Sequence, residues 1–432
     1  MKNKFLMSFL FMLLPFVLFV GCSSENSSVQ KESNEVGSGS VEKEEEITLR
    51  IWFGRDAFIP GDNFKAFMEE NPNIKVETDV IPLETVVSEF IRSAQAGNAP
   101  DIMQTSHDTL GPLVTQGLLL DMTPHLNRWE SEDPESFNNM MESAWDMASW
   151  EGVPYGLALH IGPYFHVYRQ DWFEQAGLAP TETWEDVFEV GKNLTDNHKY
   201  GFSLTAGRGV QPSWFISHFR AMGGEYNEYN APIINSEAGI YLIEFYQRLI
   251  REGIVNPEAI AWGSGEMRGS FIGGNAAMAT IGDNIFPTIQ ESLEFDVEWN
   301  VTDMPYREGA KDQAKTTMAG WPYMVSSGTK HEEAVLKLLQ YMSRTEIVGE
   351  VARRYQPTTN IAVMSESTYI EAKPWAPKMT EAFVNATPLP AHLNQQGVYE
   401  ILQDIMQEAL SNPDADPASI AEKYQLQIDA LN

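Results

Sequence analysis

The sequence predicts an α/β fold from residue 47 onward, because strand-like and helix-like segments alternate along this region. The segment ITLRIWFG opens it, and the apolar residues Ile47, Leu49 and Ile51 share one face, as in a half-buried strand. The segment FKAFMEENP predicts a helix that ends at Asn71, since Pro72 cannot continue it. IKVETDVIP then predicts a second strand, and this strand–helix–strand order predicts a parallel pair with a right-handed crossover.

The alternation continues to the end of the chain without an internal repeat, over a length typical of two domains. Helices are expected over residues 85–97, 238–253, 332–344 and 398–410. Short apolar strands are expected between them, over residues 200–205, 276–282 and 322–327.

The first residues form a separate segment that precedes this fold. Lys2 and Lys4, an apolar run over 5–20 and a small residue at position 21 predict a secretory signal at 1–21. The sequence VGC ends at Cys22 and resembles a bacterial lipobox, which implies cleavage before this cysteine and its acylation; Phe19 departs from the usual aliphatic residue. A plain signal peptide and an uncleaved anchor are the alternatives, although the run falls short of the ~20 residues that span a bilayer.

Residues 22–46 are rich in Ser and Glu and lack aromatic side chains, so they predict a flexible, lipid-anchored tether. Cys22 is the only cysteine, which excludes intramolecular disulfides. We therefore expect the mature protein at the outer face of the cytoplasmic membrane of a Gram-positive bacterium. The lipid would be its only attachment to that membrane.

Charge limits the possible partners. The formal charge is −32, and removal of a signal segment containing two lysines leaves 27 basic against 61 acidic residues, or −34. Such a chain is repelled by nucleic acid and by anionic membrane surfaces. We interpret the acidic side chains as a solvated surface.

Several motifs occur in a characteristic order along the folded region. APDIMQTSHDTLGPLVTQGLLLDMTP is the longest of them, and the others are IWFGRD, WEGVPYGLALHIGPYFHVYRQDWFEQAGL, AAMATIGDN, GWPYMVSSGTKHEEAVLKLLQYMS and QPTTNIAV. In combination they resemble the extracellular solute-binding proteins of carbohydrate ABC importers (family 1), in particular maltose/maltodextrin-binding proteins.

This resemblance implies a two-lobed periplasmic-binding-protein type II fold with a ligand cleft between two α/β lobes. The first lobe would contain residues 47–157 plus 321–348, and the second would contain 158–320 plus 349–432. Clefts at the carboxyl ends of strands are where α/β proteins usually bind ligands, which agrees independently. The implied function is that of a monomeric receptor that captures a carbohydrate, expected to be an oligosaccharide, and presents it to an ABC permease with a separate ATPase, without a cofactor.

A sugar offers C–H faces to aromatic rings and hydroxyls to polar side chains. Asp108 and Asp56 match acidic residues of the family, whereas Thr105 and Thr109 replace its tryptophan and arginine, which argues against a malto-oligosaccharide. Trp52 has an alternating position that is equally compatible with the core. The full set of expected ligand-binding residues is Trp52, Asp56, His107, Asp108, Tyr155, His160, Trp214, Asp283, Asn284, Trp321 and Arg354.

Two other classes of function stay open. An anchored polysaccharide-degrading enzyme is disfavoured because the chain has neither a GxSxG elbow nor an HExxH metal motif, so we expect no catalytic residue and no metal. A binding protein for a peptide, a polyamine or glycerol phosphate is the other alternative. A phosphorylated ligand would need several basic groups, and the arginines near candidate loops are Arg55, Arg208, Arg268 and Arg354.

Overall fold

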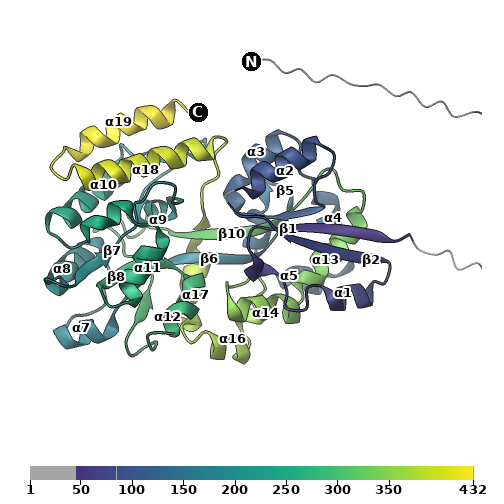
Figure 1. The fold of residues 1–432 in the computed structure, drawn as a ribbon, viewed down its shortest axis with the longest axis horizontal. Helices are drawn as coiled ribbons and strands as arrows, with labels where there is room; N and C mark the ends of the chain where they lie inside the picture. The colour runs from purple at the N-terminus through teal and green to yellow at the C-terminus, as the bar shows by residue number, and fades with distance from the viewer. Residues whose placement is uncertain (1–44, 84, 432) are drawn as a thin grey trace, which may run out of the picture. The chain divides into compact units, whose positions relative to one another are not determined.

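The computed structural model describes residues 45–83 and 85–431 (Figure 1). The predicted signal segment, Cys22 and the tether up to residue 44 lie outside the described residues. In the part of the chain that is described, helices are too short or too polar to cross a membrane.

The first predicted strands form as expected. β1 (Ile47–Phe53) pairs in parallel with β2 (Ile74–Val80), and α1 (Lys65–Glu70) lies between them in the chain. β3 (Ile102–Gln104) pairs in parallel with β1 on its other side. The prediction of a parallel pair is therefore confirmed.

Two long strands connect the two halves of the sheet. β6 (Gly156–Tyr168) and β10 (Thr316–Val325) are antiparallel partners, and the end of β10 also pairs with β3. The second half of β6 pairs with β8 (Ala276–Gly282) and β9 (Asn300–Thr302). In Figure 1, both long strands run from the helices around β1 to those around β8.

Within the described residues, this sheet has nine strands, along the path β2-β1-β3-β10-β6-β8-β7. β7 (Tyr200–Ser203) is parallel to β8, and β11 (Ala386–Pro388) is parallel to the start of β10. A separate hairpin consists of β4 (Ser149–Trp150) and β5 (Val153–Pro154). This mixed α/β architecture confirms the predicted fold class.

Helices surround the sheet in two groups. The group around β1 to β3 consists of α2 (Val86–Gln95), α3 (Leu110–Thr115), α4 (Thr123–Glu132), α5 (Pro134–Asn138), α6 (Ser143–Asp146), α13 (Glu332–Ser343), α14 (Thr345–Arg354), α15 (Ile361–Met364) and α16 (Ser367–Ala372). The group around β7 and β8 consists of α7 (Gln170–Ala176), α8 (Trp184–Leu194), α9 (Ser213–Ala221), α10 (Glu237–Arg251), α11 (Ser264–Ile272), α12 (Phe286–Gln290), α17 (Ala376–Asn385), α18 (Gln395–Ser411) and α19 (Pro417–Asp429).

Local sequence signals set several helix ends. Thr183 caps α8 by accepting a hydrogen bond from the backbone N–H of Asp186, whose carboxylate accepts one from the N–H of Thr183. Gly177 ends α7 at φ 69°, a left-handed conformation that glycine adopts without strain.

Separate hydrophobic clusters lie on either side of the long strands. One contains Leu49 and Phe53 of β1 and continues to Val351 and Ala376, beyond residue 348. Another contains α8, α9, α10 and α18. The predicted division of the chain at residues 348 and 349 stays a prediction, and the β1 cluster extends across it.

Candidate ligand-binding site

Asp108 lies in η2 (His107–Thr109), the 3-10 turn that follows β3, and its side chain is 2% exposed. Its Oδ2 atom accepts a hydrogen bond from the hydroxyl of Tyr399 on α18 and one from Nε2 of Gln211 at 3.1 Å. The other oxygen, Oδ1, is buried and has no hydrogen-bond partner within the described residues. A carboxylate of the predicted first lobe is thus oriented by side chains of the predicted second lobe.

The two groups next to this carboxylate remain uncharged. Burial and the Asp108 carboxylate raise the pKa of Tyr399, so that its hydroxyl remains a donor. Burial lowers the pKa of His107, and its Nε2–H donates to the carbonyl oxygen of Leu389 at 2.6 Å. The hydrogen bonds that fix η2 therefore come from the uncharged side chains of Tyr399, Gln211 and His107.

Aromatic side chains gather around Trp321 on β10. The Phe58 ring lies 5.7 Å from that of Trp321, and the Arg55 guanidinium lies 5.3 Å from its centroid. Tyr355 and His160 also contact Phe58, with ring centroids 5.1 and 5.2 Å away. The indole Nε1 of Trp321 is buried without a hydrogen-bond partner in the described chain.

A second aromatic group comes from α9 and β6. Trp214 donates its Nε1–H to the carbonyl oxygen of Thr280 at 2.8 Å, and its ring meets Tyr164 edge to face at 5.9 Å. Tyr164 interacts electrostatically with Arg55, Asp108 and Asp283. Tyr164 therefore connects several of the predicted site residues.

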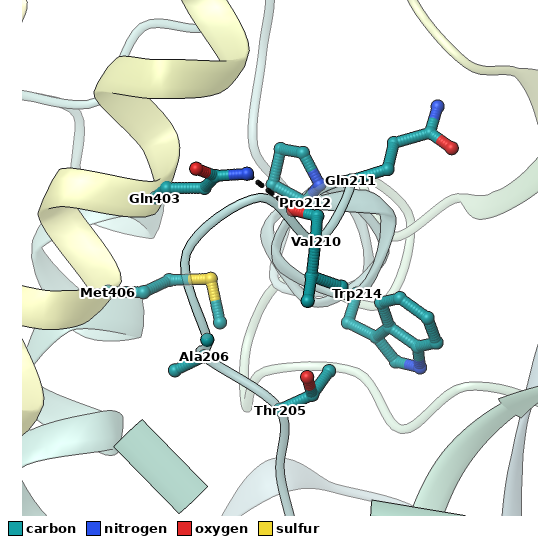
Figure 2. Close-up of a pocket in the computed structure, with 9 residues that line it drawn as sticks. Thr205, Ala206, Val210, Gln211, Pro212, Trp214, Gln403 and Met406 are labelled. Carbon is teal, nitrogen blue, oxygen red and sulfur yellow. Dashed lines mark hydrogen bonds between the residues drawn. The ribbon is translucent and has the colours of Figure 1, made fainter. Parts of the chain in front are cut away.

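A small cavity lies beside Trp214 (Figure 2). Its volume is about 10 Å³, on the order of the space that one water needs. Figure 2 shows Gln403 bonded to the carbonyl oxygen of Val210, while the Gln211 side chain points away from Met406. The cavity is too small for a pyranose; Gln211, which lines it, also donates its side-chain hydrogen bond to Asp108.

Asp283 follows β8 in η4 (Asp283–Ile285) and is fully buried. Burial raises its pKa to about 8, although the Lys373 charge opposes this shift, and the backbone amide of Asn284 does so weakly. Neither carboxylate oxygen has a well-formed hydrogen bond within the described residues. The side chains of Asp283 and Gln356 both lie against the backbone at Gly162. A Cβ at this position would lie 2.7 Å from Asp283 Oδ1 and 2.1 Å from Nε2 of Gln356, so only glycine leaves room for them.

Lys373 is the counter-charge of Asp283. Burial lowers its pKa to about 8, while the Asp283 carboxylate opposes this change. Its Nζ donates a hydrogen bond to the carbonyl oxygen of Tyr355 at 2.7 Å. Burial therefore favours the neutral form of both groups, and each charge opposes that shift in the other.

Several predicted site residues have contacts typical of the core or of a supporting role. Trp52 is 7% exposed in an apolar cluster with residues of α2 and α3, and Tyr155 packs against the same cluster. Burial lowers the pKa of His160 to about 3, so its imidazole is neutral. Arg354 donates to the carbonyl oxygens of Ala57 and Ile59, which fixes the turn η1 (Asp56–Phe58).

The structure thus brings Asp108, Trp214 and Asp283 to one region around Tyr164. Trp321 is linked to this region through Arg55 and is 8% exposed in the β1 cluster. The ligand-binding roles of all four residues stay predictions. Asn284 is half-buried beside them, and Asp56 is exposed at the start of η1. The sequence analysis missed Gln211 and Tyr399. The loop around Gln211 offered a weak sequence signal for a binding residue. Tyr399 offered none, because an aromatic residue in an amphipathic helix usually packs in the core. No group of three or more potential metal ligands occurs in the described chain.

Comparisons with known proteins agree with this architecture. The profile of the bacterial extracellular solute-binding protein family matches residues 57–348. The galactooligosaccharide-binding protein of Bacillus subtilis is 21% identical over 399 residues, covering 85% of this chain and 90% of that protein. A probable amino-acid ABC transporter periplasmic-binding protein of Sinorhizobium fredii is 24% identical over 216 residues, and this match spans only 48% of that protein and 49% of this chain.

Among solved structures, an ABC transporter solute-binding protein of Thermotoga lettingae bound with α-D-tagatose has the same fold. It superimposes with a TM-score of 0.74 at 22% sequence identity and covers 89% of this chain and 99% of its own. The matched profile includes β6, β8, β10 and the turns that carry Asp108 and Asp283. The chain belongs to the bacterial extracellular solute-binding protein family.

Proposed function

We propose that this protein captures a carbohydrate, in particular an oligosaccharide, at the site around Asp108 and delivers it to an ABC permease with a separate ATPase. The observation that carries the proposal is the Asp108 carboxylate, which has one oxygen oriented by Tyr399 and Gln211 and one buried oxygen without a partner in the described chain. A free carboxylate oxygen accepts a sugar hydroxyl, and the nearby rings of Trp214 and Trp321 suit the C–H faces of a pyranose. The B. subtilis and T. lettingae proteins named above support this ligand class.

Affinity would depend on closure of the predicted lobes. Asp108 comes from the turn after β3, whereas Tyr399 and Gln211 come from segments 291 and 103 residues away in the chain. A ligand that bonds to both sides stabilises the conformation in which they meet. We propose lobes of residues 47–157 plus 321–348 and 158–320 plus 349–432, acting as a monomer without a cofactor.

The location of the protein follows from the family and the N-terminal sequence. Proteins of this family are extracellular, and we propose that acylation of Cys22 holds this one at the outer face of the cytoplasmic membrane of a Gram-positive bacterium. Cys22→Ser should release a soluble protein that still binds ligand, measured by cell fractionation. If the variant stays in the membrane fraction, the lipid-anchor proposal is wrong.

An amino-acid or peptide ligand is the second candidate, because the S. fredii relative is named for amino-acid transport. Thermal shift with a panel of mono- and oligosaccharides, amino acids and peptides separates the two. A ligand at 100 times its Kd should add ~2.7 kcal/mol of stability. We expect oligosaccharides to raise the Tm and Asp108→Ala to remove the shift; a panel in which only amino acids or peptides act would overturn the sugar assignment.

The same samples test for catalysis. We propose that the protein is a receptor and not an enzyme, in line with the binding role of its family. Bound oligosaccharides should be recovered intact after prolonged incubation. New reducing ends, detected by a colorimetric assay, would instead indicate a polysaccharide-degrading enzyme.

A further inference from the structure

The four arginines that the sequence places near candidate loops differ in whether their charge is compensated. Arg208 pairs with Asp404 at 2.7 Å, and Arg354 pairs with Glu350 at 3.0 Å. Within residues 45–83 and 85–431, no ion pair or hydrogen bond joins Arg55 or Arg268 to another side chain; the Arg55 guanidinium only packs over Trp321. This is notable in a chain with 61 acidic residues against 29 basic ones.

These two arginines come from different elements and face a common region. Arg55 precedes η1, in the predicted first lobe, and lies on the Trp321 ring. Arg268 lies on α11, which packs against β8 in the predicted second lobe. It is half-buried and lies within electrostatic range of Arg55, Tyr355 and Tyr164, so both positive charges act on the region of the aromatic groups.

Neither of the two nearest buried carboxyl groups, those of Asp108 and Asp283, forms an ion pair with these arginines in the described chain. Asp283 faces the Lys373 charge, and Asp108 accepts hydrogen bonds from neutral donors. Asp56 is exposed and forms no ion pair with its neighbour Arg55 in the described chain. Burial and the Arg55 charge both lower the pKa of Arg268 without neutralising it, since a guanidinium stays protonated in proteins. Two like charges, one from each predicted lobe, thus lie within electrostatic range of each other.

We propose that the bound carbohydrate carries an anionic group, a uronic acid carboxylate or a phosphate, which binds between Arg55 and Arg268. This inference rests on the proposed function. Guanidinium groups bind carboxylates and phosphates through paired, charge-assisted hydrogen bonds. An anion between the two arginines also removes the repulsion that opposes closure, so an acidic sugar favours the closed state over a neutral one.

Calorimetric titration of the full chain tests this proposal with three matched probes: galacturonate oligosaccharides, galactose oligosaccharides of equal length, and a hexose phosphate. We expect an acidic probe to bind at least about tenfold more tightly than the neutral one, and this preference should weaken with salt. Arg268→Gln and Arg55→Gln should each remove about tenfold of the acidic affinity and leave the neutral affinity nearly unchanged.

Arg248→Gln is the matched control. This arginine of α10 packs over Phe188 at 3.8 Å and also lacks an ion pair in the described chain, but it lies away from the site. It should change neither affinity. Arg55 is exposed, so its variant should fold even if Arg268→Gln does not, and circular dichroism checks both.

The outcomes separate the two proposals. Tight binding of the hexose phosphate alone supports the anion site with phosphate as its ligand, and tight binding of galacturonate oligosaccharides alone supports the carboxylate. Equal affinity for neutral and acidic sugars, unaffected by Arg55→Gln, overturns the anion site but leaves the carbohydrate receptor intact. Binding of amino acids or peptides in place of any sugar overturns both.

Discussion

Asp108 and Asp283 occupy corresponding places in the fold but have different surroundings. Each lies in a 3-10 turn that comes after a strand, β3 or β8, and before a short helix. Asp108 accepts hydrogen bonds from a hydroxyl and an amide, whereas Asp283 has mainly the Lys373 charge to offset its burial. Hydrogen-bond donors can thus hold a buried carboxylate in place while leaving its second oxygen without a partner. A counter-charge alone leaves the carboxylate costly to bury.

The largest expected effect comes from breaking the Asp283–Lys373 pair. Lys373→Met should be less stable than the double variant Lys373→Met/Asp283→Asn by about 3–5 kcal/mol, because without the Lys373 charge the buried Asp283 must stay protonated at pH 7, far above its ordinary pKa of 3.8. Urea denaturation at pH 7 measures the difference.

Lys378→Met is the control for this pair, since Lys378 also binds an aspartate, Asp296, at 3.0 Å, but at an exposed position. It should lower the stability by roughly 0.2–1 kcal/mol. A Lys373→Met protein as stable as the double variant would show that Asp283 does not depend on this charge.

The corresponding change at the first turn is Asp108→Ala. It removes the acceptor of the Tyr399 hydroxyl, and an unsatisfied buried hydroxyl costs about 1–3 kcal/mol of unfolding free energy. In the Tyr399→Phe background the same substitution should cost clearly less, as urea denaturation of the four proteins measures. Equal costs in both backgrounds would mean that the hydrogen bond contributes little.

The pH dependence of stability distinguishes the two turns further. The folded pKa of Asp283, about 8, exceeds its ordinary value of 3.8, so the folded protein loses stability as pH rises from about 4 to 8. The folded pKa of Lys373, about 8, is below 10.5, so stability is regained between about 8 and 10. Relative to the double variant, the stability should therefore have a minimum near pH 8, with a slope of at most about 1.4 kcal/mol per pH unit. A flat difference between pH 5 and 10 would contradict this.

The smallest effect concerns the exposed ion pair that supports η1. Glu350→Gln removes the partner of Arg354, whose side chain and that of Glu350 are each 40% exposed, and should lower the stability by roughly 0.2–1 kcal/mol. Because Arg354 still donates to the carbonyl oxygens of Ala57 and Ile59, the sugar affinity should stay unchanged in calorimetry. A large loss of affinity would show that the ion pair itself positions Arg55.

Local patterns explain why much of the fold was predictable. The alternation in β1, the proline after α1 and the apolar faces of α10 and α13 depend on neighbouring residues in the chain, so they identify strands and helices directly. Asp108 and Asp283 were predicted because each follows a recognisable strand in a motif of the family, and their roles stay predictions. Trp52 stayed ambiguous because alternation shows which residues share a face of a strand but not what covers that face. In the structure, residues of α2 and α3 cover the Trp52 side chain.

The sequence by itself determined the α/β class, the family resemblance and the two turns at which the site is predicted. The tertiary structure alone decided which residues meet there: Tyr399 with Asp108 across 291 positions, Lys373 with Asp283, and Arg55 with Arg268. Hydrogen bonds and charges act over a few ångströms in space, and the separation of two residues along the chain says nothing about that distance until β6 and β10 bring their elements together.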